Sequence, residues 1–201
     1  MNLKAVKKVI VLASAMVMLG TGVFAVTLTD IGGHWAESNI LELVEAGVIN
    51  GYQDDTFRPQ GTISKAEFIK LLIAASAPSW YDFSEGYNNP AHWALPYVDL
   101  AQTYNVIYPG ELTVDNLNEP VTRKEMAIWM AKADVSMMFH PFATESVVSF
   151  SDCGEFSNED LVWINQVVAR GYINGYTDNT FKPEKNMTRA EAATVIYRYT
   201  R

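Results

Sequence analysis

Cysteine, glycine and positive charge are all scarce in this chain. Its one cysteine, Cys153, excludes an intrachain disulfide framework, and 12 glycines in 201 residues exclude a collagen-like fibrous repeat. Lys and Arg number 15 against 23 Asp and Glu, a net charge of -8, which argues against binding nucleic acid or an anionic membrane through overall charge. The chain is nevertheless 49% hydrophobic and 12% aromatic, so it is not disordered and can form a folded core.

An uncharged apolar run occupies residues 9–20, near the N-terminus. It is too short for a comfortable bilayer span, which needs about 20 apolar residues. Three lysines within residues 4–8 precede it and the small residue Ala25 follows it, a pattern typical of a cleaved secretory signal peptide. We therefore predict that residues 1–25 are a signal peptide, that the protein is exported, and that no membrane span remains after cleavage. The alternative is an uncleaved N-terminal anchor.

The rest of the chain repeats itself. Shifted by 124 positions, residues 50–67 fall on residues 174–191 without a gap, and they share Asn-Gly-Tyr, Thr-Phe-Arg/Lys-Pro and Ser/Thr-Lys/Arg-Ala-Glu. A shift of 58 places His34-Trp35 on His92-Trp93. We therefore predict three repeats, which span residues 26–88 with a connector, 89–149 with a connector, and 150–201.

Each repeat is predicted to form a helix, a turn-rich loop and a second helix. In the first repeat Ala36, Ile40 and Leu43 recur at helical spacing, and Gly47 ends the helix. Each second helix opens with a capping box, in which a hydroxyl is followed three residues later by a glutamate: Ser64 and Glu67, Thr122 and Glu125, Thr188 and Glu191. Helices this short cannot bury their apolar faces alone, so we predict an all-α, mostly helical fold whose repeats share one core.

The repeated residues resemble those of the S-layer homology (SLH) family. The resemblance rests on Asp30-Ile31, His34-Trp35-Ala36, Gly47 to Tyr52, Thr56-Phe57-Arg58-Pro59 and Ser64-Lys65-Ala66-Glu67, and on their counterparts from Phe150-Ser151-Asp152 to Thr188-Arg189-Ala190-Glu191. It implies three repeats in a pseudo-threefold helical bundle. It also implies non-covalent anchoring of exported proteins to an anionic, often pyruvylated, secondary cell-wall polysaccharide of Gram-positive bacteria. In some diderm bacteria such repeats instead link an outer-membrane protein to peptidoglycan.

Each of the three repeats departs from the family pattern in some respect. In the second, Pro109-Gly110 takes the place of Gly51-Tyr52, and the third has Trp163 further along its helix in place of the His-Trp pair. Lys65 also stands where the family usually has arginine. We therefore expect one or two working inter-repeat grooves rather than three.

Lys65, Arg123 and Arg189 each directly follow the N-cap of a predicted helix. A cation there opposes the helix dipole and costs about 0.3–1 kcal/mol at an exposed site, yet the choice is made three times. Free helix amides and a cation together form a site for a carboxylate or phosphate, so we predict that these residues bind the acid group of the polymer. The alternative is an ion pair with an acidic residue of a neighbouring repeat, such as Asp30 or Asp152.

Aromatic and acidic residues complete the predicted ligand-binding set. Trp35 and Trp93 offer faces to sugar C–H groups or pack in the core, and Tyr52 and Tyr176 offer similar faces or pack the loops. Asp30 and Asp152 cap the first helices or bind sugar hydroxyls. The glycines Gly51 and Gly175 belong to the same pockets.

No enzyme signature selects a catalytic group. The three histidines do not converge on a zinc site, and the loop aspartates lack the calcium-binding alternation. No phosphate loop or nucleophile elbow occurs, and a lone Cys153 is typical of packing. We predict a non-enzymatic protein of the cell wall or cell surface, without metal or cofactor, whose partner is a wall polysaccharide and not nucleic acid. The alternative is an exported adaptor that binds another exported protein through its acidic surface and its aromatic connector, Trp80 to Tyr87.

Overall fold

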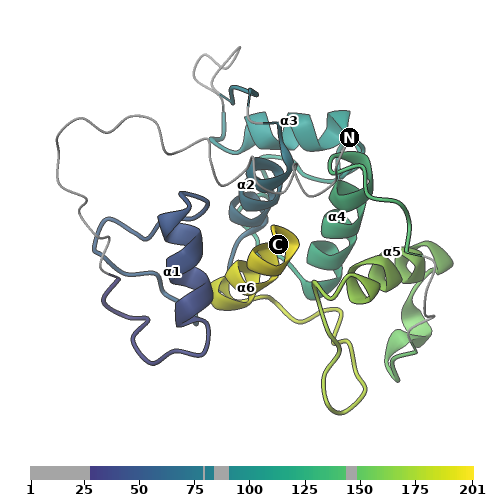
Figure 1. Ribbon diagram of the computed structural model, residues 1–201. Coiled ribbons are helices and arrows are strands. Elements are labelled where there is room, and N and C mark those ends of the chain that lie inside the picture. The colour runs from purple at the N-terminus through teal and green to yellow at the C-terminus, as the bar shows by residue number, and fades with distance from the viewer. Residues whose placement is uncertain (1–27, 79, 84–90, 144–148) are drawn as a thin grey trace, which may run out of the picture.

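The computed structural model describes residues 28–78, 80–83, 91–143 and 149–201 (Figure 1). The predicted signal peptide and the predicted boundary at residues 88 and 89 lie outside these ranges. Within them the chain forms six α-helices and a short 3-10 helix, with isolated β-bridges and no sheet, which confirms the all-α prediction. The helices are α1 (Glu37–Glu45), α2 (Lys65–Ser76), α3 (Leu95–Thr103), α4 (Arg123–Ser136), η1 (Cys153–Glu155), α5 (Asn158–Ala169) and α6 (Arg189–Tyr199).

The three predicted capping boxes form at the starts of α2, α4 and α6. In each box the cap hydroxyl accepts from the backbone N–H of the glutamate at 3.2 Å, and the glutamate accepts from the backbone N–H of the cap residue at 2.8–2.9 Å. A further box, Ser157 with Asp160, opens α5 and was not predicted. Local sequence therefore sets where these helices begin.

The first helix of each pair ends in a left-handed residue. Gly47 follows α1 with φ +69° and Gly171 follows α5 with φ +73°, as predicted for Gly47. After α3 the equivalent position is Asn105, with φ +56°. Glycine and asparagine tolerate this conformation best, so each helix stops where the chain must turn into its loop.

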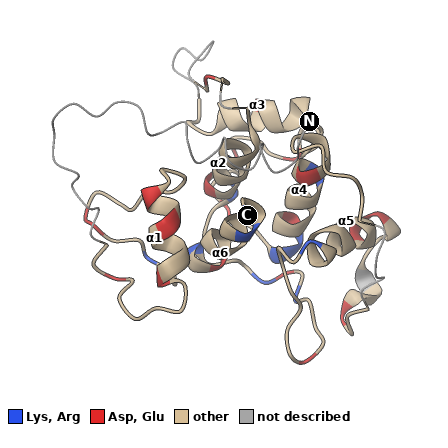
Figure 2. Cartoon of the chain, in the orientation of Figure 1, with Lys and Arg blue, Asp and Glu red and all other residues tan. Residues whose placement is uncertain are grey.

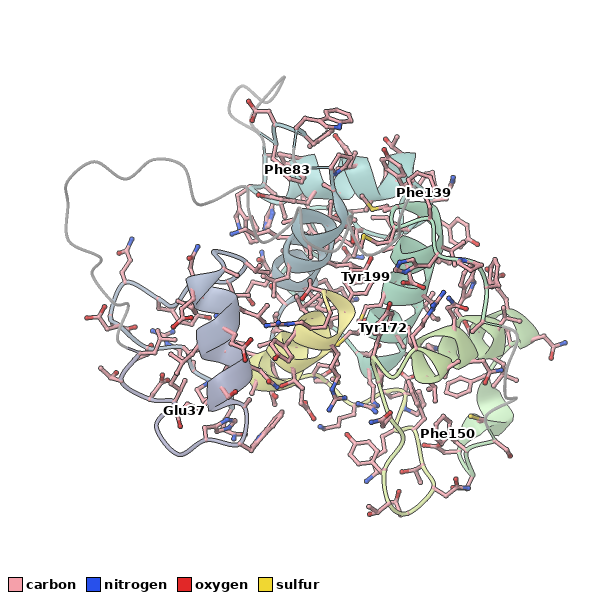
Figure 3. All side chains as sticks on the ribbon, in the orientation of Figure 1. Glu37, Phe83, Phe139, Phe150, Tyr172 and Tyr199 are labelled. Carbon is pink, nitrogen blue, oxygen red and sulfur yellow. The ribbon has the colours of Figure 1, made fainter. Side chains whose placement is uncertain are left out.

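Each first helix packs on the second helix of a different pair. The contacts join α1 to α6, α3 to α2 and α5 to α4, while α2 also contacts α4 and α6 (Figure 1). The core therefore lies around α2, α4 and α6, where Phe68 stacks on Trp129 with ring centroids 6.4 Å apart. Tyr172, from the loop after α5, packs against Tyr199 of α6 in the middle of the molecule, with ring centroids 5.2 Å apart (Figure 3).

A closed triangle of backbone hydrogen bonds joins the three loops just before α2, α4 and α6. Ile63 N–H donates to Met187 C=O at 3.0 Å, Met187 N–H to Val121 C=O at 3.0 Å, and Val121 N–H to Ile63 C=O at 3.1 Å. All three side chains are buried. Because equivalent hydrogen bonds join the three pairs in a cycle and each first helix packs on a neighbouring pair, the pseudo-threefold bundle that the resemblance implied is confirmed.

The two connectors pack against the helices in their described parts. In the first, Phe83 stacks on Tyr97 of α3 at 4.3 Å, whereas Trp80 is 78% exposed. The second is held by the fully buried carboxylate of Asp134 in α4, which accepts from three side chains and pairs with the guanidinium of Arg170. The three donors are His140 Nδ1 at 2.6 Å, Tyr172 OH at 2.8 Å and Gln166 Nε2 at 2.9 Å.

Candidate functional site

The backbone amides at the starts of α2, α4 and α6 are not free. Lys65 N–H donates to Glu119 C=O at 2.9 Å, Arg123 N–H to Lys185 C=O at 2.9 Å, and Arg189 N–H to Gly61 C=O at 2.8 Å. The next amide of each helix also donates to a loop carbonyl, and the third donates to the cap hydroxyl. The prediction of free helix amides for an anion is therefore wrong, because neighbouring loops use them, and only the side-chain cations are available for that role.

The ion pairs of these cations link one helix pair to the next. Arg189 Nη1 lies 2.9 Å from Glu67 Oε1, and Lys65 Nζ lies 3.0 Å from both Glu119 and Glu125. The predicted partners, Asp30 and Asp152, are wrong. The acids are instead the capping-box glutamates of the neighbouring pair, together with Glu119 just before α4, because the bundle brings the helix starts together. Figure 2 shows basic segments gathered around α6 and the start of α4 in the middle of the molecule, while acidic segments also lie at its edge, on α1.

Arg189 lies in a cavity of about 300 Å³. Its guanidinium carbon is 4.6 Å from the ring centroid of Tyr52 and 4.7 Å from that of Phe57, and its Nε donates to Phe57 C=O at 2.7 Å. The loop after α1 forms one wall of the cavity, α2 forms another, and Trp93, which precedes α3, completes it. The cavity thus takes residues from all three helix pairs.

This first cavity combines two cations with one carboxylate. Arg189 and Lys70 supply the positive charge and Glu67 the negative charge. Tyr52 OH also donates to Glu67 Oε1 at 3.4 Å, and Trp93 is 48% exposed at the rim. An excess of positive charge beside exposed aromatic faces suits a ligand that is both acidic and sugar-like.

Arg123 is the counterpart of Arg189 but is only 7% exposed. Its guanidinium carbon lies 4.9 Å from Tyr176 and 4.8 Å from Phe181, repeating the arrangement at Tyr52 and Phe57, and it donates to Asn174 C=O. Lys185, rather than Arg123, pairs with the box glutamate Glu191. Burial lowers the pKa of Arg123, against the raising effect of Tyr176 and Glu191. Arg123 is therefore placed to hold its loop more than to meet a solvent-borne ligand.

Lys65 is held by two carboxylates and lines neither the first cavity nor a second one between α4 and α5. Burial alone would lower the pKa of Lys65, but the hydrogen bonds to Glu119 and Glu125 outweigh it and raise the pKa. Of the three predicted cations, Arg189 is the one that reaches a cavity.

Asp30 and Asp152 bind loop amides. Asp30 accepts from the N–H groups of Phe57 and Arg58 at 2.7 Å each, and Asp152 accepts from Phe181 and Lys182 at 2.8 Å each. The prediction that they cap the first helices is wrong, since α1 begins after Ala36 without a side-chain cap and α5 is capped by Ser157. The carboxylates instead fix the loops at Arg58 and Lys182, whose φ angles are +58° and +57°.

The segments that build this geometry match a known protein family. The sequence profile described as the S-layer homology domain matches residues 27–69 and 164–193. The chain carries S-layer homology repeats. The matched segments contain the loop and cap of the first pair and the loop and cap of the third, including Tyr52 and Arg189.

Relatives of the SLH chain include three bacterial proteins. It is 30% identical over 181 residues to the exoglucanase XynX of Acetivibrio thermocellus, covering 86% of this chain and 16% of that protein. It is 53% identical over 45 residues to a cellulosome-anchoring protein of the same organism, covering 22% and 10% of the two chains. It is 26% identical over 175 residues to an S-layer protein of Bacillus thuringiensis subsp. finitimus, covering 81% and 20%.

The SLH chain spans a small part of these three relatives, 16%, 10% and 20% of their lengths. SLH domains are binding and anchoring modules, and the exoglucanase matches through this region alone. The similarity to an S-layer protein and a cellulosome-anchoring protein places the chain at the cell surface.

The predicted aromatic residues of the SLH repeats separate into two groups. Trp35 and Trp93 are 62% and 48% exposed, so the alternative of core packing is wrong for both. Trp93 and Tyr52 line the first cavity, whereas Trp35 and Tyr176 do not. The Tyr176 hydroxyl is buried without a hydrogen-bond partner among the described residues.

Packing explains Gly51 and Gly175, the glycines that recur in the loops of the first and third repeats. A Cβ on Gly51 would overlap Leu28, and a Cβ on Gly175 would overlap Phe150, which lies beside η1 (Figure 3). Gly51 also lines the first cavity, but its missing side chain is required by Leu28 in any case.

Sequence reasoning missed Lys70, which lines the first cavity. The sequence does contain a signal that could have identified it. After the first turn of α2, Lys70 is the one charged residue among mostly apolar neighbours. It also missed a second cavity near α4 and α5, since Lys132 there reads as an ordinary helix residue.

Clustered metal ligands and bilayer-crossing helices are both absent from the described ranges. No group of three or more His, Cys, Asp or Glu side chains comes together there as a metal site. None of the described helices has both the length and the apolar character that a bilayer crossing needs. Burial raises the pKa of the Cys153 thiol, which disfavours the reactive thiolate.

Proposed function

We propose that this SLH module anchors an exported protein to the cell wall by binding an anionic, pyruvylated secondary cell-wall polysaccharide in the Arg189 cavity. Its repeats are residues 26–88, 89–149 and 150–201, each with its connector where one follows, after a signal peptide at residues 1–25. The anchoring and S-layer names among its relatives support this role.

One observation carries the proposal. The Arg189 guanidinium stands beside Tyr52 at 4.6 Å in a cavity of about 300 Å³, with Lys70 as a second cation. A ligand carboxylate would replace Glu67 as the partner of Arg189 and bind it with two parallel hydrogen bonds. The C–H face of the sugar ring would lie on Trp93.

Co-sedimentation with wall sacculi of the producing organism tests the proposal. Sacculi are compared before and after chemical extraction of the non-peptidoglycan polymer, and extraction should abolish retention of the protein. Retention that survives extraction would show that the polymer is not the ligand.

Variants assign the binding to the cavity. Lys70→Gln removes a cavity cation that makes no described hydrogen bond, and it should weaken retention about tenfold, the loss of one charge-assisted contact. Lys124→Gln is the matched control, because Lys124 pairs with Glu184 away from the cavity. Arg189→Gln should weaken retention further, with circular dichroism as a check of folding because Arg189 also holds Phe57 C=O.

A second candidate function is protein binding by the first connector. The observation that favours it is Trp80, which is 78% exposed beside the edge-to-face pair Tyr81 and Phe83. An adaptor would ignore sacculi and retain an exported partner in a pull-down, and Trp80→Ala would release that partner.

A further inference from the structure

A second cavity, of about 420 Å³, lies between the loop after α3 and helices α4 and α5. Aromatic rings, carboxylates and one ammonium group line its walls. The lining residues are Tyr108, Pro109, Glu111, Ile128, Lys132, Glu159, Asp160 and Trp163. None of these residues belongs to the set predicted from the sequence to bind the ligand.

Lys132 is the unusual member of this cavity. The residue is only 6% exposed, and its Nζ lies 3.9 Å from the ring centroid of Tyr108 and 5.7 Å from that of Trp163. Among the described residues its ammonium has no hydrogen-bond acceptor and no carboxylate partner. The Nζ atom itself is not fully enclosed, so its three N–H donors reach into the cavity. These donors are free to bind a ligand oxygen next to Nζ.

The carboxylates of this cavity differ in how far they are already used. Glu111 accepts from Trp129 Nε1 at 2.6 Å and from Tyr108 N–H at 2.8 Å, one bond on each oxygen. Glu159 accepts from Tyr108 OH at 2.9 Å and from Trp163 Nε1 at 3.4 Å, both on Oε1. Oε2 of Glu159 accepts no hydrogen bond from the described residues and is available to a donor of the ligand.

The net charge of the second cavity is opposite to that of the first. Three carboxylates surround the single ammonium of Lys132, whereas the first cavity has two cations and one carboxylate. An acid group would be repelled from the second cavity, while a hydroxyl both accepts from an ammonium and donates to a carboxylate.

We propose that the second cavity binds an uncharged sugar unit of the same wall polymer whose acid-bearing unit occupies the Arg189 cavity. This inference rests on the proposed function. A sugar hydroxyl accepts from Lys132 Nζ, another donates to Glu159 Oε2, and the C–H face of the ring lies on Trp163 and Tyr108. One chain then contacts the module at two chemically different sites.

The test uses the indole N–H signals of Trp93 and Trp163 in NMR spectra of the whole chain, assigned with Trp→Phe variants. The probe is the non-peptidoglycan wall polymer of the producing organism, either native or with its carboxyl groups chemically reduced to alcohols. Native polymer should shift both signals. Reduced polymer should shift Trp163 alone.

The outcomes separate the two proposals. This inference is overturned if the Trp163 signal responds to neither polymer, or if it responds to native polymer and not to reduced polymer. In either case, a Trp93 response to native polymer leaves the proposed function standing. With native polymer, a silent Trp93 beside a responding Trp163 overturns the proposed function at its own site.

Lys132→Met keeps the length and apolar stem of the side chain and removes its charge. It should weaken the Trp163 response to reduced polymer at least tenfold and leave the Trp93 response to native polymer unchanged. Lys124→Met, on the same helix but paired with Glu184, is the control and should change neither. Tyr108→Phe removes the hydroxyl that holds Glu159 in position, so it should also weaken this response. Unaltered binding by both Lys132→Met and Tyr108→Phe would contradict the proposal.

Discussion

Lys65, Arg123 and Arg189 occupy equivalent positions, yet each side chain has different surroundings. Lys65 is neutralised by two glutamates, Arg123 is buried against Tyr176 and a carbonyl, and Arg189 opens on a cavity. A repeated residue type therefore performs a repeated structural task, which is to tie one helix start to the next pair. Under the proposed function, ligand binding is added at Arg189, where neighbouring side chains leave room.

Asp30 and Asp152 should each stabilise the fold through their loops. Asp30→Asn and Asp152→Asn each replace one of two acceptor oxygens with a donor that faces a backbone N–H group. We expect each variant to lose about 1–2 kcal/mol of unfolding free energy, measured by urea denaturation. The exposed Asp115→Asn should change it by less than about 0.5 kcal/mol. Equal stability in all three variants would contradict the role of these carboxylates.

Acid should weaken the fold through Glu191. Burial alone would raise the pKa of Glu191, but Lys185 and Thr188 outweigh it and lower the pKa below the ordinary value of 4.5. The stabilisation by Glu191 is thus complete above that ordinary value and is lost as pH falls through the lower folded-state pKa. Urea midpoints between pH 5.5 and 3 should fall less steeply for Glu191→Gln than for wild type. The exposed Glu45→Gln should keep the wild-type slope.

At the scale of the element, the helix starts could be predicted because their signal is local. A hydroxyl and a glutamate three residues apart form the capping box through the backbone of a single turn. The partners of the first-turn cations and amides could not be predicted in the same way, because the partner residues Glu119, Lys185 and Gly61 belong to other helix pairs. The same reason hid the second cavity, because the position of Lys132 in its wall depends on how α4 packs against α5.

The capping boxes give a matched series of variants. Ser64→Ala, Thr122→Ala and Thr188→Ala each remove the hydroxyl that accepts from the N–H three residues on. Each should cost about 1 kcal/mol of stability, the usual value for a lost N-cap. Since the three boxes have the same geometry, thermal denaturation should give similar losses, and a loss at one box several times that at the others would argue against equivalent helix pairs.

At the scale of the whole molecule, the closed triangle of Ile63, Val121 and Met187 makes the three helix pairs one cooperative unit. Opening any pair breaks two of its three hydrogen bonds. Native-state hydrogen exchange should therefore find the amides of these three residues among the slowest, all exchanging with the free energy of global unfolding. Faster exchange at one of them would show that its pair opens independently.

The central claim is that the wall polymer is recognised through its acid groups in a cavity made by Arg189 and Lys70. Titration calorimetry of the unmodified protein with native and with carboxyl-reduced wall polymer measures this directly. A lost charge-assisted contact corresponds to about 1.5–3 kcal/mol, so reduction of the carboxyl groups should weaken binding about tenfold or more. Equal affinity for the native and the reduced polymer would contradict the claim.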